Sequence, residues 1–465
     1  MKNMTILFII SSATNLHLLE RLSLDLSKWN NTVFICYDGT DADLLKKIIC
    51  IFYSERVIVF HNYILEDNKK YIKKLNRIYK NKQVLLAHAK NHYQKLAISN
   101  HILSKTNPDL LITSEDGISG NYWLIGAAKK RHIPCITTPF GFGTSRDLEN
   151  VLSVKKQNNN LITVSGKYGK ILQKKYPHWI KTGDYAGALL FPPEYIIPLE
   201  KLGITIPQPW IIQGGVSHKI AVESKKMYQH YLNENISSTK LSLTGTVYCD
   251  IIYDIIHSCQ KLQESFQTSM PIQPANRSIL INWPPNYDPE KGQYSEFKDY
   301  EEATLAVMNF LKSLPNTTLT ICPHPAVDKK VNDLLEHLGF SVNVHHIIEL
   351  IPQHDLYISS FSSSIRYAIA CGKPVVNYDF YHFSLKDYEG EPGVITLHSF
   401  HALKNEITKL LKKDAYIEAA KLQKTSAPEW GIIDGNNFSR INTLIDTVLY
   451  RHSRLPTRLR TLLAN

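Results

Sequence analysis

Short apolar, β-rich runs alternate along the chain with longer amphipathic stretches. In the first half, strands are expected at Thr5–Ile10, Thr32–Cys36, Arg56–Phe60, Leu110–Thr113, Cys135–Thr138, Leu161–Val164, Trp210–Ile212 and Leu241–Leu243. Continuous apolar strands separated by helices are typical of a parallel sheet that is covered on both faces. The stretch Glu66–Lys105 has a helical pattern and predicts one long helix or a broken pair.

The same alternation restarts after a Pro-rich polar segment. The second set of expected strands is Ser278–Trp283, Thr317–Cys322, Ser341–His345, Leu356–Ser359 and Pro374–Tyr378. A chain of 465 residues exceeds the roughly 250–300 residues at which one core stops growing, so two domains are expected. We predict an α/β, GT-B architecture, in which two Rossmann-like domains face each other across a cleft. The expected parts are an N-terminal domain at 1–266, a linker at 267–277, a C-terminal domain at 278–440, and a helix with a basic tail at 441–465.

The composition is that of an ordinary globular chain with an excess of positive charge. Hydrophobic residues make up 43% and charged residues 20%, and the net charge is +11. Such a charge favours anionic partners, for example nucleotide phosphates or acidic lipid headgroups. No RNA-binding or zinc-finger motif is present, so no nucleic-acid partner is expected. Seven cysteines without CxxC spacing, and an N-terminal apolar run limited to residues 4–10, predict a cytoplasmic protein.

A cluster of hydroxyl side chains follows the strand expected at Leu356–Ser359. The serines are Ser359, Ser360, Ser362, Ser363 and Ser364, and a helix is expected to begin there and to end at Gly372. Hydroxyls and free N–H groups at a helix N-terminus form a phosphate site. One serine could simply cap the helix. A cap uses one hydroxyl whereas this loop offers five, so phosphate binding is the preferred interpretation.

A histidine follows the second strand of the same half. His324 lies between Pro323 and Pro325, which hold the backbone extended. An imidazole at this position could donate to a departing phosphate, and one preorganised donor contributes ~10²–10³ in rate. The alternative is a histidine that only bonds a neighbouring loop. Pro284 and Pro285, which follow the first strand of this half, are expected to shape the loop and, secondly, to contact the ligand.

In the first half, an acidic pair ends the strand Leu110–Thr113. Glu115 and Asp116 precede Gly117, which permits a tight turn that would aim a carboxylate into the cleft. Two adjacent acids raise each other's pKa, which suits a base that accepts a hydroxyl proton near neutral pH. Glu-Asp-Gly is also a common surface turn, and only its place at a strand end makes it a candidate. Which of the two acids is the base stays open.

Other strand ends of the first half offer further candidates. The acceptor-side candidates, for which plain turn chemistry is the alternative, are Ser12, Asn15, Gly117 and Gly141. Asp41-Ala42-Asp43 looks like a metal-binding pattern, but Thr40 precedes it as an expected N-cap and acids favour a first helical turn. His345-His346 has no HExxH or His/Cys companion. No metal site is therefore expected.

The three motifs, in this order, resemble the signatures of the bacterial sialyltransferases of GT-B fold. The resemblance implies that Asp116 is the catalytic base, that His324 contacts the phosphate of CMP, and that the serine loop makes the remaining phosphate contacts. The segment Asp355–Tyr378 also resembles the nucleotide loop of CDP-glycerol glycerophosphotransferases, with Ser360 where those enzymes carry an acid. The overall layout is similar to that of the non-hydrolysing UDP-GlcNAc epimerases, with His-Pro in place of their His-Arg type loop.

These resemblances imply an inverting glycosyltransferase. It would move a sialic acid-like nonulosonic acid or Kdo from a CMP-activated donor to a saccharide acceptor, in surface polysaccharide or lipopolysaccharide synthesis. The N-terminal domain would bind the acceptor and the C-terminal domain the nucleotide sugar. No cofactor is expected beyond the CMP-sugar substrate, and no metal, because protein donors would neutralise the leaving phosphate. The alternatives are a CDP-glycerol-type polyol-phosphate transferase, a UDP-GlcNAc 2-epimerase-like isomerase and a non-catalytic saccharide-binding module.

The C-terminal residues 449–463 mix four arginines with leucines. A short basic amphipathic segment can lie on anionic lipid, where each cation contributes ~1 kcal/mol. A solvated basic tail is the alternative, because Pro456 breaks a helix. If the segment binds an anionic membrane surface, the acceptor would be a lipid-linked saccharide and the protein peripheral at the inner face of the inner membrane.

Overall fold

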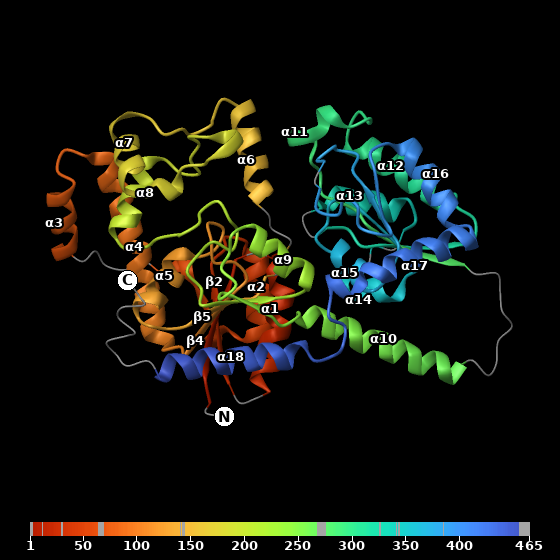
Figure 1. Ribbon diagram of the computed structural model, residues 1–465, viewed down its shortest axis with the longest axis horizontal. Coiled ribbons are helices and arrows are strands. Elements are labelled where there is room, and N and C mark those ends of the chain that lie inside the picture. Colours follow the sequence, from red (N-terminus) through yellow and green to blue (C-terminus); the bar gives the residue numbers. More distant parts are fainter. Residues whose placement is uncertain are drawn as a thin grey trace. The chain divides into compact units, whose positions relative to one another are not determined.

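The computed structural model describes residues 3–11, 13–28, 31–63, 69–139, 141, 145–266, 276–324, 327–340, 342, 345–384 and 386–454. The chain divides into two compact units, which Figure 1 shows in ribbon form. Unit 1 comprises Met1–Val222, Gln229–Ser242 and Ile441–Asn465, and unit 2 comprises Glu223–Tyr228 and Leu243–Arg440. Each unit contains its own sheet and its own hydrophobic core.

Unit 1 is built on a seven-stranded sheet with the order β3-β2-β1-β4-β5-β6-β7. Its strands are β1 (Thr5–Ile10), β2 (Thr32–Tyr37), β3 (Val57–Val59), β4 (Leu110–Thr113), β5 (Cys135–Thr137), β6 (Lys219–Val222) and β7 (Leu241–Leu243). The pairs from β3 through to β6 are parallel. β4 is buried along its whole length, as in a sheet that helices cover on both faces. The strand order reverses between β1 and β4, so their carboxyl ends mark the usual ligand position of such a sheet.

Helices cover this sheet and add a lobe beside it. They are α1 (Ala13–Ser27), α2 (Ala42–Phe52), α3 (Lys69–Ile78), α4 (Gln83–Thr106), α5 (Tyr122–Lys130), α6 (Ser145–Gln157), α7 (Gly166–Lys175) and α8 (Pro193–Lys201). The predicted helical stretch Glu66–Lys105 is a broken pair, α3 and α4. The long α4 packs against α3, α5 and α8, and α7 packs against α8 (Figure 1). A shared core joins the lobe through Leu75 of α3, Leu172 of α7 and Ile196 of α8.

Unit 2 contains a five-stranded sheet with the order β12-β11-β10-β8-β9. Its strands are β8 (Arg277–Asn282), β9 (Thr317–Ile321), β10 (Leu356–Ser359), β11 (Val375–Tyr378) and β12 (Val394–Leu397). All four neighbouring pairs are parallel. The strand order reverses between β8 and β10, and the core joins strand residues such as Ile281 and Ile358 to helix residues such as Leu311 and Leu403.

The remaining helices belong wholly or partly to unit 2. They are α9 (Lys225–Asn233), α10 (Val247–Phe266), α11 (Asp288–Lys291), α12 (Tyr300–Lys312), α13 (Lys329–His337), α14 (Ile347–Leu350), α15 (Ile365–Ala370), α16 (Phe400–Leu410), α17 (Lys413–Trp430) and α18 (Asn437–Arg454). Side-chain caps begin several of them: Asp299 accepts from the Glu302 N–H at the start of α12, and Ser399 from the Ala402 N–H at the start of α16. None of the helices in the described ranges is long and apolar enough to cross a membrane.

Several strands differ from the prediction. Trp210–Ile212 is a turn, and Leu161–Val164 contributes only an isolated antiparallel bridge from Thr163. Short apolar runs in packed loops have the same pattern as buried strands, which explains both errors. β6 and β12 were not predicted, because Lys219 and Thr396 interrupt their apolar character. Of Ser341–His345, residues 341, 343 and 344 lie outside the described part, and Val342 forms a single bridge.

The division of the chain also differs from the expected boundaries. α10, expected in the N-terminal domain, belongs to unit 2, where it packs against α14. The last helix belongs to unit 1 from Ile441 onward. Most of the expected linker, 267–275, lies outside the described residues. Composition marks a Pro-rich break in the chain, but it does not show which core a neighbouring helix packs on.

Candidate functional site

The acidic pair Glu115-Asp116 lies at the carboxyl end of β4, and its two carboxylates have different surroundings. Asp116 is 1% exposed. Its carboxylate accepts hydrogen bonds from the Gly215 N–H (3.1 Å), the Ser217 N–H (2.8 Å) and the Ser217 hydroxyl (2.5 Å). The Lys240 ammonium forms an ion pair with it at 2.8 Å. A buried carboxylate that is engaged by four donors serves to hold its loop in place and is poorly placed to take a proton from a substrate.

Glu115 is the better candidate for proton transfer. Its side chain is partly buried, and this burial is the main reason why the pKa of its carboxyl is raised to about 7. A hydrogen bond with Ser119 lowers the pKa, and the charge of Asp116 raises it. The Thr113 hydroxyl donates to the Glu115 carbonyl at 2.9 Å and so fixes the backbone. A carboxyl that titrates near neutral pH is suited to general-base chemistry. The role that the resemblance gives to Asp116 therefore fits Glu115 better.

Two glycines allow the backbone segments around this pair to approach closely. The Gly117 N–H donates to the Ile212 carbonyl at 3.1 Å, and a Cβ at Gly117 would lie 2.3 Å from the same oxygen. A Cβ at Gly215 would lie 1.7 Å from the Asp116 carbonyl oxygen. The Gly120 N–H donates to the Gly117 carbonyl at 3.2 Å, so Gly117 begins a turn, and the close backbone contact is a further reason for glycine at this position.

A polar cluster at the carboxyl end of β2 was not found from the sequence. Asp38 follows β2 and accepts from the Asn121 amide at 2.7 Å, and its other oxygen lies 3.0 Å from His61 Nε2. Burial raises the pKa of Asp38, and the charges of His61 and of Lys95 on α4 lower it in part. Asn121 caps α5 at the end of the loop that carries the acidic pair. The four residues of this cluster come from four separate segments of the chain. The sequence alone therefore offered only one indication of the cluster, namely an acidic residue directly after a strand.

The serine loop after β10 is largely bonded to itself. The Ser364 hydroxyl pairs with the Tyr357 hydroxyl at 2.6 Å and with the Ser362 hydroxyl at 2.5 Å. Ser359 and Ser360 are buried. Two of the five hydroxyls expected to bind phosphate, those of Ser362 and Ser364, therefore serve in part to shape the loop.

Ser363 is the serine of this loop that is both partly exposed and without a hydrogen-bond partner for its hydroxyl within the described part of the chain. The Ser359 hydroxyl also has no partner there, but it is buried. The preceding backbone is held by Phe361, which is left-handed (φ 51°) and donates its N–H to the Asn377 side chain at 3.1 Å. α15 has only six residues, so a phosphate at this loop would depend on Ser363 and the backbone more than on a helix dipole.

A buried ion pair holds α15, and sequence reasoning missed it. The side chains of Arg366 and Glu223 are 0% and 2% exposed. The Arg366 guanidinium donates to Glu223 Oε1 and to the Tyr367 hydroxyl, the latter at 3.1 Å. Glu223 Oε2 is buried and has no hydrogen-bond partner among the described residues. Burial raises the pKa of Glu223, and the Arg366 charge lowers it. The pair joins the residue after β6 to the helix after the serine loop.

His324 follows β9 and is positioned through its backbone. Its N–H donates to the Trp283 carbonyl at 2.9 Å, which ties it to the loop after β8. Burial lowers the pKa of His324, so the imidazole is neutral at pH 7 and retains one ring N–H as a donor. Pro325 lies outside the described residues.

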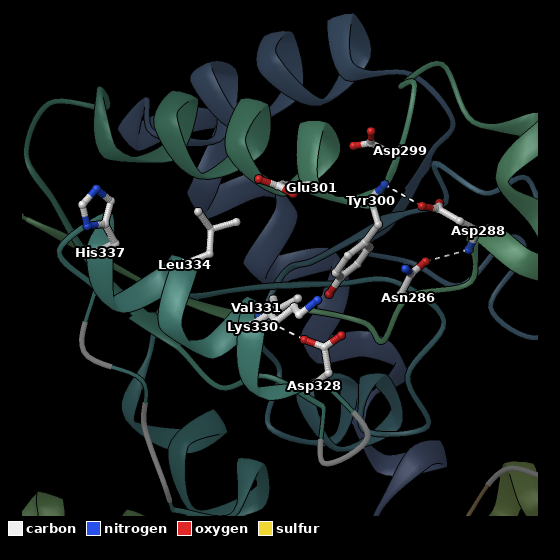
Figure 2. A pocket seen from close by; sticks show the side chains of 10 residues that line it. All are labelled: Asn286, Asp288, Asp299, Tyr300, Glu301, Asp328, Lys330, Val331, Leu334 and His337. Atoms are coloured by element: carbon white, nitrogen blue, oxygen red, sulfur yellow. Dashed lines mark hydrogen bonds between the residues drawn. The ribbon is translucent and has the colours of Figure 1, made fainter.

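A pocket of about 650 Å³ lies beyond the loop after β8 (Figure 2). Its lining is Asn286, Asp288, Asp299, Tyr300, Glu301, Asp328, Lys330, Val331, Leu334 and His337. Pro284 is buried and its carbonyl accepts from the Tyr300 hydroxyl at 2.6 Å, while Pro285 is partly exposed. Pro284 thus helps to hold this loop through its carbonyl. Four acids against one lysine would repel a phosphate, so we do not place the nucleotide phosphate in this pocket.

The other sequence candidates have simpler positions. Ser12 lies outside the described residues, and Asn15 is in α1. A Cβ at Gly141 would meet nothing within 4 Å, so no close contact requires glycine there. Asp41, rather than Thr40, caps α2 by accepting from the Asp43 N–H at 2.9 Å. His346 caps α14. No group of three or more His, Cys, Asp or Glu side chains in the described part could hold a metal ion.

Comparison with known proteins gives similarity at the level of structure only. No protein-family model matches the chain, and a search of curated proteins finds no match. A UDP-GlcNAc 2-epimerase from Neisseria meningitidis, bound to UDP-GlcNAc, is 15% identical with a TM-score of 0.52 and covers 95% of this chain and 100% of its own. The calicheamicin glycosyltransferase CalG4 is 11% identical with a TM-score of 0.54, covering 97% and 99%. The wall teichoic acid polymerase TagF, soaked with CDPG, is 12% identical with a TM-score of 0.52, covering 97% and 90%.

These similarities extend over nearly the whole length of the chain and include both sheets. At such low identity they establish the fold, and they do not by themselves assign an activity. The two parallel sheets with alternating helices agree with the architecture of these proteins. The chain therefore has the two-domain α/β GT-B fold that its hydrophobic pattern predicts.

Proposed function

We propose that the protein is an inverting glycosyltransferase that transfers a nonulosonic acid or Kdo from a CMP-activated donor to a saccharide acceptor. The observation that carries the proposal is the partly buried Glu115 carboxyl, whose pKa is about 7, at the carboxyl end of β4. This strand borders the point where the strand order reverses. Similar structures bound to UDP-GlcNAc or soaked with CDPG support a nucleotide-linked donor, and the CMP preference rests on the sequence resemblance.

In this mechanism Glu115 is the general base. Deprotonated at and above neutral pH, it accepts the proton of the acceptor hydroxyl while that oxygen attacks the anomeric carbon of the donor. The bond between the anomeric carbon and the phosphate oxygen breaks, CMP departs with the electron pair, and the anomeric configuration inverts. Asp116 contributes indirectly, because it holds the loop that carries Glu115.

Hydrogen-bond donors of unit 2 stabilise the departing CMP. The neutral His324 imidazole donates one ring N–H, and the Ser363 hydroxyl donates one O–H, to the phosphate oxygens as their charge develops. The acceptor is a saccharide, which would be lipid-linked if the protein works at a membrane surface.

Nucleotide titration tests the donor. We expect CMP to bind more tightly than UDP in calorimetry, and we expect His324→Ala and Ser363→Ala each to weaken CMP binding roughly tenfold or more, because each removes a hydrogen bond to a charged group. The exposed residues His401 and Ser313 give matched controls, and His401→Ala and Ser313→Ala should bind CMP as the wild type does. A preference for UDP, or no nucleotide binding, would reject the proposal.

An epimerase is the second candidate, because several similar structures are UDP-GlcNAc 2-epimerases. Such an enzyme would convert UDP-GlcNAc into its 2-epimer without an acceptor, and NMR of the nucleotide sugar detects this directly. A TagF-like polymerase would leave phosphate in the product, which ³¹P NMR detects. Either product, formed without a CMP-sugar, would replace the transferase proposal.

A further inference from the structure

Two stretches of unit 1 carry many cations and no acid. From Lys69 to Lys105 the sequence contains ten Lys or Arg residues and no Asp or Glu. Between residues 150 and 183 it contains seven lysines and again no acid. Charge runs of this kind are commonly solvated, and they become a binding surface only where the fold brings them together.

The fold brings most of the exposed cations of these stretches to one lobe, where Lys201 of α8 joins them, and we call this set the basic face. Its members are Lys69, Lys70, Lys73, Lys74, Arg77, Lys80, Lys82, Lys167, Lys170, Lys174, Lys175 and Lys201. Their helices are joined, because α3 and α8 both pack against α4, and α7 packs against α8 (Figure 1). Burial lowers the pKa of Lys201, and the charges of Lys82 and Lys175 lower it further. Cations from the ends of three segments therefore lie near one another.

The basic face is not neutralised within the described part of the chain, where none of its members forms an ion pair. The apolar side of α3 points inward, since Leu75 and Tyr79 are 3% and 4% exposed. Two aliphatic side chains remain outside among the cations: Ile78 is 44% exposed and Val84 is 58% exposed. The surface thus combines a concentrated positive charge with exposed aliphatic groups.

We propose that the basic face docks the protein on an anionic lipid surface. Lysines on flexible stems suit the diffuse charge of lipid headgroups, and exposed aliphatic side chains can enter the interface. A surface for single-stranded nucleic acid instead offers aromatic rings for base stacking and planar Arg groups, whereas eleven of these twelve cations are lysines. This docking is independent of the transferase proposal, and it uses none of the residues of the C-terminal tail at 455–465.

Vesicle co-sedimentation of the full chain tests the proposal. We expect binding to vesicles of phosphatidylcholine with phosphatidylglycerol, little binding to phosphatidylcholine alone, and weakening by salt. The variant Lys73→Glu/Arg77→Glu/Lys174→Glu should bind the anionic vesicles about tenfold more weakly or worse, because each cation contributes to adsorption. The control Lys412→Glu/Lys413→Glu/Lys421→Glu makes the same change in net charge at exposed residues of unit 2, and it should bind as the wild type does.

The outcomes separate a lipid surface from other polyanions. Absence of binding to anionic vesicles at low salt, or an equal loss in the control variant, would overturn the proposal. Binding to single-stranded RNA without vesicle binding would also overturn it. Ile78→Ser/Val84→Ser should reduce the binding that persists at high salt, and unchanged binding there would argue against contact with lipid. Circular dichroism and CMP titration of each variant show whether it is folded. If the wild type does not bind CMP, only the transferase proposal is affected, and circular dichroism alone serves as the test of folding.

Discussion

Replacing Glu115 by glutamine is expected to lower kcat/KM for glycosyl transfer by about 10²–10⁴-fold, which is the usual contribution of a general base. Glutamine keeps the size and polarity of the side chain and its place after β4, but it cannot accept the hydroxyl proton. CMP binding should be unchanged, because the proposed phosphate contacts are His324 and Ser363. The measurement is steady-state transfer from a CMP-sugar donor, combined with CMP titration of the same sample. Wild-type activity in this variant would remove Glu115 from the mechanism.

The pH dependence provides a second readout for the same residue. In the wild type, kcat/KM should rise with pH through about 7, because burial raises the pKa of Glu115 to that value and only the carboxylate is a base. The raised pKa means that the folded state binds more protons than the unfolded state between the ordinary value of 4.5 and about 7. The contribution that protonated Glu115 makes to the free energy of unfolding is therefore fully present below pH 4.5 and is lost as the pH rises through about 7. Glu115→Gln should lose both the rise in rate and this part of the stability profile.

Asp116→Asn separates the two acids. The substitution leaves the Lys240 ammonium beside a neutral amide and weakens the bonds from the Gly215 and Ser217 N–H groups. Removing one partner of a buried pair is strongly destabilising, so we expect a lower thermal midpoint. Activity measured well below that midpoint should fall less than in Glu115→Gln. A larger loss of activity in a fully folded Asp116→Asn protein would return the base to Asp116.

The parts of the fold that the sequence predicts well depend on local pattern. β1, β4 and β10 are continuous apolar runs, and each ends as expected. The acidic pair and the serine loop were found because each directly follows such a strand. The pattern shows which residues follow a strand, but it does not show whether their side chains already form hydrogen bonds with other segments of the fold. Asp116 and Ser364, both expected to meet substrate, are examples, because each also bonds to residues of its own surroundings.

Contacts between distant segments cannot be predicted from this sequence alone. Asp38 meets Asn121 and His61 only because three loops end at the same edge of the sheet. Glu223 and Arg366 are far apart in the chain, and each has an ordinary local context, after a strand and inside a short helix. A single sequence carries no local signal for such pairs, and their existence depends on how the elements pack.

Breaking the Glu223–Arg366 pair from one side is expected to destabilise unit 2 by about 3–5 kcal/mol, because it leaves a buried charge without its partner. Both side chains are almost completely buried, at 2% and 0% exposure. Glu223→Gln leaves the Arg366 guanidinium without its negative partner, and Arg366→Met leaves the Glu223 carboxylate without its positive partner. Hydrogen exchange of the peptide that contains α15 reports the loss locally, without requiring the two units to unfold together. The exposed pair Lys225–Glu429 supplies a control, and Glu429→Gln should change stability by less than about 1 kcal/mol.

The double variant Glu223→Leu/Arg366→Met decides what the pair does. Apolar side chains that replace both charges remove the unpaired-charge penalty, so the double variant should be more stable than either single variant. α15 begins directly after Ser364, so a loop that depends on the pair for its position should bind CMP more weakly in the double variant even where stability has recovered. Recovery of both stability and CMP binding would instead limit the pair to holding α15 in the core. If each single variant were as stable as the wild type, the ion pair would have no structural role, and the unpaired Glu223 Oε2 would then need another explanation.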